Sequence, residues 1–153
     1  MTPNVPHHRA AAHRPELKER HGRRLRVHVV VMPQLTLVRG IPGSGKTTLA
    51  KSMGVRHYEA DMWYDRFNAG RFDASKLKVA HAWCQSKTQA ALCEGDDVVV
   101  SNTFTRRWEL QPYIDMAKML GVRVEEVVCE GRFQNVHGVP EDRVAEMAAR
   151  FEA

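Results

Sequence analysis

The stretch Gly40-Ile41-Pro42-Gly43-Ser44-Gly45-Lys46-Thr47 matches the pattern G-x-x-x-x-G-K-[ST] at every fixed position. Its glycines let the backbone wrap closely around an anion and turn successive N–H groups inward. In loops of this type the lysine reaches the β- and γ-phosphates of a nucleotide, and the hydroxyl that follows ligates Mg²⁺. We therefore interpret residues 40–47 as a phosphate-binding loop.

The segments on either side of the loop have the pattern that such a loop requires. Leu35-Thr36-Leu37-Val38 is a short apolar strand, and residues 48–53 can continue from the loop as a helix that Gly54 ends. A helix that begins at Lys46 adds the positive end of its dipole at the phosphate. Strand, loop and helix together predict a nucleoside triphosphate site, and the absence of a guanine-reading N-K-x-D motif from the sequence favours ATP over GTP.

Length and composition predict one globular domain. The chain has 153 residues, of which 43% are hydrophobic, which is enough for a real core. The sequence has neither an apolar run of about 20 residues nor the apolar segment of a signal peptide, so we expect a cytoplasmic protein without a membrane partner. The three cysteines form no C-x-x-C pair and are expected to be reduced thiols rather than a disulfide.

The positive charge is concentrated at the N-terminus. Residues 1–32 hold seven Arg and Lys against two Glu, whereas residues 33–153 hold sixteen basic and sixteen acidic residues. We expect 1–32 to be a disordered basic tail or a non-native N-terminal extension, with Met32 as a hypothetical natural start and 33–153 as the folded domain. Two alternatives remain open for the tail: residues 27–31 could extend a strand, and the basic residues could touch nucleic acid.

The remaining pattern predicts an α/β fold. Asp97-Val98-Val99-Val100-Ser101 is a continuous apolar run typical of a buried parallel strand. Further strands are expected at 55–60 and 122–128, with helices at 75–94 (capped by Asp73 or Ser75) and from Pro140 onward. Between them, Thr105 can cap a helical stretch that opens with Arg106 and Arg107, and Pro112 is expected to start a fresh helix at 112–120. These elements predict a three-layer α/β/α sandwich with a mostly parallel sheet of four or five strands.

Asp61 directly follows the predicted strand 55–60. A carboxylate at the carboxyl end of a strand in an open parallel sheet lies in the ligand crevice, so Asp61 is a candidate general base or a partner of the metal's water shell. An ordinary cap on the next turn is the alternative. The aromatic residues between Met62 and Phe72 are expected to form a loop with Gly70 as a turn, and this loop either lines an acceptor pocket or only packs.

The end of the strand at 97–101 lacks an acid. Phosphate-loop enzymes usually hold Mg²⁺ with a carboxylate at this position, but the residues here are Ser101, Asn102 and Thr103. Asn102 is therefore expected to hydrogen-bond a water or a phosphate, and metal binding is assigned to Thr47 and Asp61. Arg106 and Arg107 follow, and they either stabilise phosphoryl charge or are solvated on a helix surface.

The loop, the Glu59-Ala60-Asp61 strand end, Val100-Ser101-Asn102-Thr103 and Asn135-Val136-His137-Gly138-Val139-Pro140 resemble one group of proteins. These are the small P-loop kinase-like proteins of phage and bacteria, which are related to the kinase domain of phage polynucleotide 5′-kinases, and the resemblance covers about 33–153. It implies that Lys46 and Thr47 are the P-loop lysine and hydroxyl residue and that Asp61 activates the acceptor hydroxyl. It also implies that the polar loop 130–139 is a lid.

The chain departs from that group at three charged positions. The group has an arginine three residues after the aspartate, where this chain has Tyr64, and it has Ser-Asp-Thr where this chain has Ser101-Asn102-Thr103. Its lid has Arg before Asn, where this chain has Gln134, and Arg132 is the candidate to replace it. The resemblance therefore implies the fold but not a nucleic-acid 5′-hydroxyl as the substrate.

Together these observations predict a kinase that transfers the γ-phosphoryl group of ATP–Mg²⁺ to a hydroxyl acceptor, either a nucleic acid end or a small metabolite. The alternative is an ATPase or nucleotide-binding regulatory module without an acceptor. The predicted catalytic residues are Lys46, Asp61 and Arg132. The predicted nucleotide-binding residues are Gly40, Pro42, Gly43, Ser44, Gly45, Lys46, Thr47, Thr48 and Asn102.

Overall fold

The computed structural model describes residues 31–133, 135 and 137–153. Residues 32–153 form one compact unit. The predicted basic tail, apart from its last two residues, lies outside the described residues. The same holds for most of the strand extension predicted at 27–31.

Four parallel strands form a single sheet in the order β2-β3-β1-β4. Strand β1 lies in the middle, with Leu35 beside Val98 of β3 on one side and beside Val124 of β4 on the other. This sheet, with helices on both faces, confirms the predicted α/β P-loop fold. The strands are β1 (Gln34–Arg39), β2 (Arg56–Tyr58), β3 (Val98–Asn102) and β4 (Arg123–Val128).

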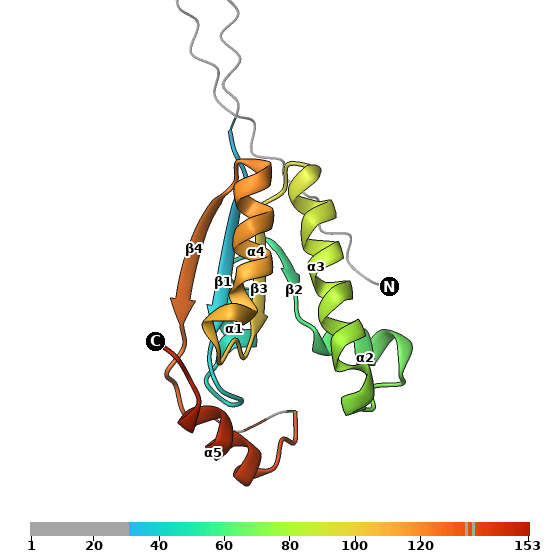
Figure 1. Cartoon of the computed structure of the whole chain (residues 1–153), viewed down its shortest axis with the longest axis vertical. Coiled ribbons are helices and arrows are strands. Elements are labelled where there is room, and N and C mark those ends of the chain that lie inside the picture. The colour runs from blue at the N-terminus through green and yellow to red at the C-terminus, as the bar shows by residue number, and fades with distance from the viewer. Residues whose placement is uncertain (1–30, 134, 136) are drawn as a thin grey trace, which may run out of the picture. The chain divides into compact units, whose positions relative to one another are not determined.

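Helices cover the two faces of the sheet unequally. In Figure 1, α3 and α4 lie side by side in front of the sheet and α1 lies behind it. Because strand residues alternate between faces, Leu35 and Leu37 pack with the α3 and α4 side, whereas Val38 packs with Ala50 of α1. The helices are α1 (Lys46–Ser52), α2 (Asp61–Phe67), α3 (Leu77–Cys93), α4 (Arg107–Leu120) and α5 (Glu141–Ala149), with a 3₁₀ turn at Ala74–Lys76.

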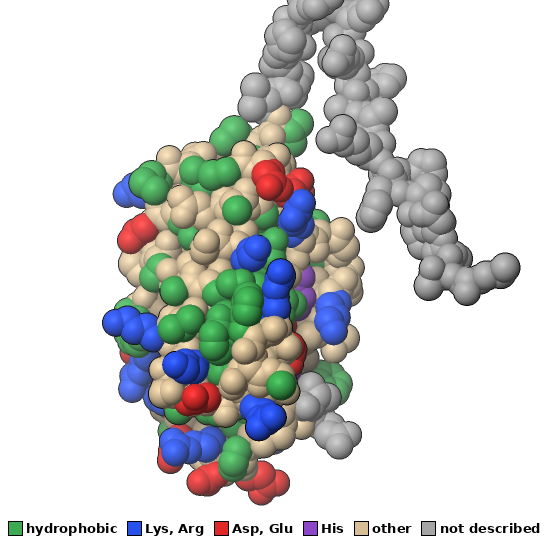
Figure 2. Space-filling model, turned by 90° about the vertical axis from the view of Figure 1, so that its right-hand side faces the viewer, with side chains coloured by type: hydrophobic (Ala, Val, Ile, Leu, Met, Phe, Trp, Pro, Cys, Tyr) green, Lys and Arg blue, Asp and Glu red, His purple; other side chains and the backbone are tan. Residues whose placement is uncertain are grey.

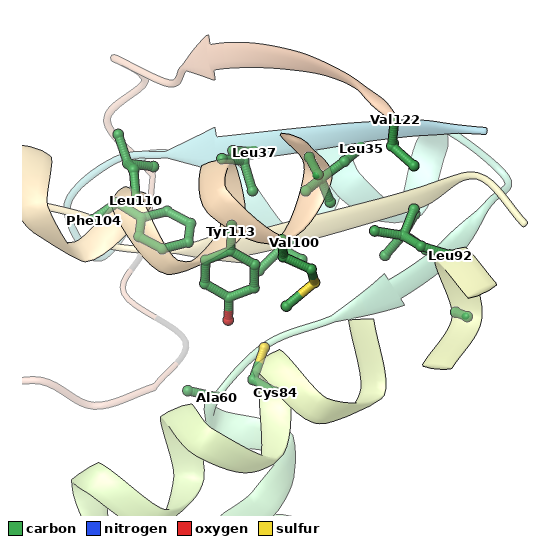
Figure 3. Packing of buried hydrophobic residues seen from close by; sticks show 14 of the residues in the cluster. Leu35, Leu37, Ala60, Cys84, Leu92, Val100, Phe104, Leu110, Tyr113 and Val122 are labelled. Carbon is green, nitrogen blue, oxygen red and sulfur yellow. The ribbon is translucent and has the colours of Figure 1, made fainter. Parts of the chain in front are cut away.

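The larger core lies between the sheet and the pair of helices α3 and α4. Figure 3 shows Tyr113 of α4 and Cys84 of α3 pointing toward each other across this core, and both side chains are buried. Phe104, just past the end of β3, packs edge to face on Tyr113 with 5.6 Å between ring centroids. The buried side chains of α3 are Ala80, Cys84, Thr88, Ala91 and Leu92.

Two element predictions are wrong. The residues expected to form an aromatic loop form helix α2, in which Tyr64 is buried against Phe72 and Trp63. Helix α4 runs unbroken from Arg107 to Leu120, so the fresh helix expected at Pro112 is wrong, although the helical start at Arg106 and Arg107 is as expected. The Glu109 carboxylate accepts the Arg106 N–H at 2.8 Å and so caps this start. Pro112 is an exposed residue inside that helix.

Cys84, Cys93 and Cys129 are all free thiols. On the side of the molecule seen in Figure 2, Lys and Arg side chains are interspersed with acidic and hydrophobic ones. None of the helices that the structure describes is long and apolar enough to cross a membrane.

Candidate functional site

The carboxyl ends of the four parallel strands meet at one edge of the sheet. The phosphate loop follows β1 there, and its Gly40 N–H donates to the Thr103 carbonyl just past β3 at 3.2 Å. Cys129, just past β4, donates its N–H to the Arg39 carbonyl at 2.7 Å. Two shallow hollows lie at the opposite edge, around Val55 and Asp97, where β2 and β3 begin. Because open parallel sheets bind ligands at the carboxyl ends of their strands, the carboxyl edge is the candidate site.

The phosphate loop has the backbone that an anion cradle needs. Gly43 and Gly45 have φ angles of 82° and 91°, in the left-handed region that favours glycine. No described side chain caps the start of α1, so its first N–H groups point into the loop without a side-chain partner. The Ser44 hydroxyl is also buried without a hydrogen-bond partner among the described residues. These unsatisfied donors fit a phosphate group.

Lys46 bends back onto the loop. Its Nζ donates to the Ile41 carbonyl at 3.3 Å. Burial lowers the pKa of Lys46, and the negative charges of Glu59 and Asp61 partly oppose this effect. A buried ammonium group with one long hydrogen bond still has donors left for a phosphate. Of the other predicted loop residues, Pro42 is buried and Thr48 is exposed.

Thr47 contacts a carboxylate that the sequence analysis overlooked. Its hydroxyl donates to Glu59 Oε1 at 2.6 Å, and Glu59 also accepts from Ser101 at 2.5 Å. Burial raises the pKa of Glu59, but hydrogen bonds from His57, Ser101 and Thr47 outweigh that effect and hold the pKa at about 2. The sequence did contain a signal for Glu59. Like Asp61, it is a carboxylate close to the carboxyl end of strand β2.

The oxygen groups at this point suit Mg²⁺. Magnesium prefers carboxylate and hydroxyl oxygens, and it takes one or two of them from the protein and the rest from phosphates and water. Among the residues that the structure describes, no group of three or more His, Cys, Asp or Glu side chains forms a metal cage. Thr47 and Glu59 therefore form the kind of partial site at which Mg²⁺ arrives together with a nucleotide.

Asp61 is the first residue of α2 and its side chain is about half exposed. The only charged group recorded within 4 Å of it in the described part of the chain is His137, with 3.8 Å between Nδ1 and the Asp61 carboxylate. His137 belongs to the loop predicted to be a lid. Asp61 thus lies at the carboxyl edge, opposite that loop, in an exposed position where a substrate can reach it.

Asn102 has a different role from the predicted phosphate contact. Its side chain is buried, and its Oδ1 accepts the N–H of Ala60 at 2.9 Å. Its Nδ2 lies 3.9 Å from the Cys84 sulfur. Asn102 therefore joins β3 to the start of α2 and fixes the position of Asp61.

The three candidate arginines differ in their surroundings. Arg106 pairs with Glu152 at 3.0 Å, and Arg107 pairs with Glu126 at 2.6 Å. Arg132 is exposed, and the next residue, Phe133, donates its N–H to the Gly43 carbonyl at 2.7 Å. Arg132 is thus held beside the phosphate loop, while the other two belong to ion pairs. Gln134, the third departure noted above, lies outside the described residues.

Comparisons with known proteins agree with this arrangement. Residues 35–132, more than half of the chain, match the family described as the AAA domain. NEDD4-binding protein 2 of Homo sapiens is 28% identical over 134 residues, which cover 77% of this chain and 8% of that protein. The chain thus spans less than a tenth of the length of this relative.

Solved structures show the same fold at low sequence identity. A chain of the Pnkp1/Rnl/Hen1 RNA repair complex superposes with a TM-score of 0.63 at 15% identity, over 78% of this chain and 44% of that one. The Mycobacterium tuberculosis APS kinase CysC, in complex with AMPPNP and APS, superposes with a TM-score of 0.52 at 16% identity, over 65% of this chain and 63% of that one. The chain belongs to the AAA domain family, and its fold is that of the P-loop kinase-like proteins.

Proposed function

We propose that the protein is a kinase that transfers the γ-phosphoryl group of ATP to a hydroxyl acceptor. The observation that carries the proposal is the meeting of three groups at one sheet edge. These are the phosphate loop with Lys46, the Thr47–Glu59 oxygen pair and the exposed Asp61, with the loop 131–133 seated over them. This arrangement supplies phosphate binding, a place for Mg²⁺ and a base for the acceptor.

Each residue has a defined part in the proposed reaction. The loop N–H groups and Lys46 hold the phosphates, and Arg132 approaches the γ-phosphate from the lid. Asp61 accepts the proton of the acceptor hydroxyl as its oxygen bonds to the γ-phosphorus, and the bond from that phosphorus to the bridging oxygen breaks to release ADP. When bound through Thr47, Mg²⁺ neutralises charge on the phosphates. Positioning and electrostatics supply most of the rate.

Similar proteins suggest two classes of acceptor. One solved structure with this fold belongs to an RNA repair complex and another is an APS kinase. A nucleic acid 5′-hydroxyl and a small metabolite hydroxyl are therefore both to be tested. Tyr64, at the position where the phage kinases have an acceptor-binding arginine, is 3% exposed. We therefore expect an acceptor that needs no phosphate contact from this position.

A second candidate function is an ATPase or nucleotide-binding module without an acceptor. The pairing of Arg106 and Arg107 with Glu152 and Glu126 favours it, because it removes two cations that could bind an acceptor. The exposed Asp61 favours the kinase, because a buried carboxylate could not meet an acceptor hydroxyl.

The test is a transfer assay with γ-labelled ATP and a panel of acceptors. The panel holds DNA and RNA 5′-hydroxyl oligonucleotides, nucleosides and hydroxyl-bearing metabolites. We expect Asp61→Asn to lower transfer by about a hundredfold or more while ATP affinity stays nearly constant. The matched control is Asp65→Asn, one turn later on the same helix and also exposed. Unchanged transfer in Asp61→Asn would remove Asp61 from this role, and release of free phosphate alone would support the ATPase.

A further inference from the structure

Glu59 is the most constrained carboxylate at the carboxyl edge of the sheet. Its side chain is 8% exposed, and three polar groups surround a single oxygen, Oε1. The Thr47 hydroxyl donates to it at 2.6 Å and the Ser101 hydroxyl at 2.5 Å, and the His57 Nε2 lies 3.1 Å away. They come from helix α1, strand β3 and strand β2. Each element that forms the phosphate-binding edge near Thr47 therefore contributes to holding this one oxygen.

The direction of these hydrogen bonds follows from the donors available. An ionised carboxylate can only accept, so both hydroxyls give their hydrogens to Glu59. His57 Nε2 lies 2.7 Å from the Ser101 oxygen, whose hydrogen is already used, so Nε2 must itself carry a hydrogen. The Thr47 oxygen consequently keeps its lone pairs directed away from Glu59, and these lone pairs are the part of the hydroxyl that a cation needs.

The second oxygen of Glu59 has no such partners. No described residue forms a hydrogen bond to Oε2, whereas Oε1 accepts two and also lies 3.1 Å from the His57 Nε2. A carboxylate that is nine-tenths buried normally fills the hydrogen-bonding capacity of both oxygens. Oε2 is thus an acceptor beside the phosphate loop that a water molecule can reach.

Glu59 also lies where an acid from β3 would reach. Ser101 lies in β3 next to Asn102, the position at which the resemblance places the missing acid, and the Ser101 hydroxyl is 2.5 Å from the Glu59 carboxylate. A carboxylate at position 101 would therefore extend into the volume that the Glu59 carboxylate fills. The neighbouring strand β2 supplies the charge that β3 lacks.

We propose that Glu59 is the positioning residue of the metal site, supplied from β2 in place of an acid on β3. Through Oε1 it takes the Thr47 hydroxyl hydrogen and leaves the Thr47 oxygen free for the cation, and through Oε2 it accepts from a water on that cation. This inference rests on the proposed function. The sequence assigned both metal binding and proton transfer to Asp61. With Glu59 at the metal, Asp61 keeps only the role of accepting the proton of the acceptor hydroxyl.

The test measures metal affinity rather than turnover. Mn²⁺, observed by electron paramagnetic resonance, is titrated into the full chain in the presence of ATP. We expect Glu59→Gln to weaken Mn²⁺ binding to the protein–ATP complex by about ten- to a hundredfold, the usual effect of removing a partner of a metal ligand. Asp61→Asn should bind Mn²⁺ as the wild type does, and the exposed Asp65→Asn serves as the matched control. ATP affinity in EDTA should be similar in all four proteins.

A rescue variant separates the metal role from a role in folding. The double variant Glu59→Gln with Ser101→Asp returns one carboxylate to the same place from β3, and we expect it to recover most of the lost Mn²⁺ affinity. If Glu59 only contributed to packing at the sheet edge, a carboxylate introduced on β3 would not restore Mn²⁺ affinity. If Glu59→Gln alone does not fold, the double variant still decides the question, provided that its thermal unfolding is cooperative.

The outcomes divide clearly. Weak Mn²⁺ binding in Glu59→Gln, with recovery in the double variant, supports the inference. Wild-type Mn²⁺ affinity in Glu59→Gln, or a folded double variant that binds no Mn²⁺, would overturn it and leave the proposed kinase intact. A wild-type protein that binds no ATP, with or without metal, would overturn both.

Discussion

At the scale of single residues, Arg39 organises the edge of the sheet on which the site is built. Its guanidinium is fully buried and donates to the Phe104 carbonyl at 2.9 and 3.1 Å. It also pairs with Glu126 at 2.8 Å and lies over the Phe151 ring at 4.7 Å. A buried cation needs such partners, because leaving one unpaired is strongly destabilising. Arg39 immediately precedes the phosphate loop, so the same contacts fix the base of that loop.

The ion pair with Glu126 predicts a pH-dependent stability. Burial raises the pKa of Glu126, but Arg107 and Arg39 outweigh that effect and hold the pKa below its ordinary value of 4.5. The stabilisation is therefore complete above about pH 4.5 and is lost as pH falls through the lowered pKa. We expect Glu126→Gln to lower the free energy of unfolding by about 2 kcal/mol at pH 7, and by progressively less in acid.

Urea unfolding at a series of pH values measures this effect. Glu125→Gln is the matched control, because Glu125 lies next to Glu126 on β4 and, among the described residues, bonds to the neutral side chain of Gln34 alone. A loss of stability in Glu126→Gln that stayed constant from pH 7 to pH 3 would contradict the ionic origin.

Asn102 carries a second prediction at this scale. Its Oδ1 is the partner of the buried Ala60 N–H, so Asn102→Ala leaves that donor unsatisfied and should cost about 1–3 kcal/mol of unfolding free energy. ATP affinity should stay nearly unchanged, because both polar atoms of the side chain contact protein groups, the Ala60 N–H and the Cys84 sulfur. Calorimetric titration and denaturant unfolding measure the two quantities, with the exposed Gln89→Ala on α3 as control. If Asn102→Ala weakened ATP binding and left stability unchanged, the result would support the original prediction that Asn102 contacts a phosphate.

At the scale of secondary-structure elements, α5 differs from the other helices. None of its residues is buried, so little core packing holds it. The chain is instead attached on either side of it. Before α5, the Phe133 N–H binds the phosphate loop, and after α5 the Glu152 N–H binds the Thr105 carbonyl at 2.7 Å. A helix fastened mainly through its flanking segments is suited to move as a lid.

The attachment after α5 can be tested through Phe151. Its ring lies against the Arg39 guanidinium, a contact worth about 1–2 kcal/mol when it is shielded from water. We expect Phe151→Ala to speed amide hydrogen exchange of residues 141–149 by about tenfold, while exchange in α3 stays unchanged. The control is Met119→Ala, a large side chain that is 77% exposed. Equal acceleration in α3 would mean that the contact stabilises the whole fold rather than the lid.

The elements with local signals were predicted well. The apolar run 97–101 is a fully buried strand, and the glycine-rich loop lies between a strand and a helix as its pattern requires. Helix α2 was missed because its clustered aromatic residues do not show the apolar spacing of an amphipathic helix. Its start is also fixed by a hydrogen bond from Asn102, which belongs to a strand distant in sequence. A fresh helix was wrongly expected at Pro112 because proline favours a first turn, whereas here it lies inside a helix that the Glu109 cap starts at Arg107.

At the scale of the whole molecule, the parallel topology decides which side chains meet. All four strands end at one edge, so residues far apart in sequence converge there. The sequence was sufficient to propose roles for Lys46 and Thr47, which lie within one contiguous motif. It was not sufficient for Glu59 and Ser101, because their contact depends on β2 lying beside β3 in the sheet order. The buried partners of Arg39, which come from three separate segments, depend on the same convergence.

The most direct test of the central claim, a nucleotide site on this phosphate loop, is a calorimetric titration of the wild-type protein and of Lys46→Ala with ATP. We expect one site per chain in the wild type, binding that is tighter with Mg²⁺ than with EDTA, and a loss of about tenfold or more in Lys46→Ala. Wild-type protein that is folded and binds no ATP would contradict the assignment of the loop. Equal affinity in Lys46→Ala would contradict it as well.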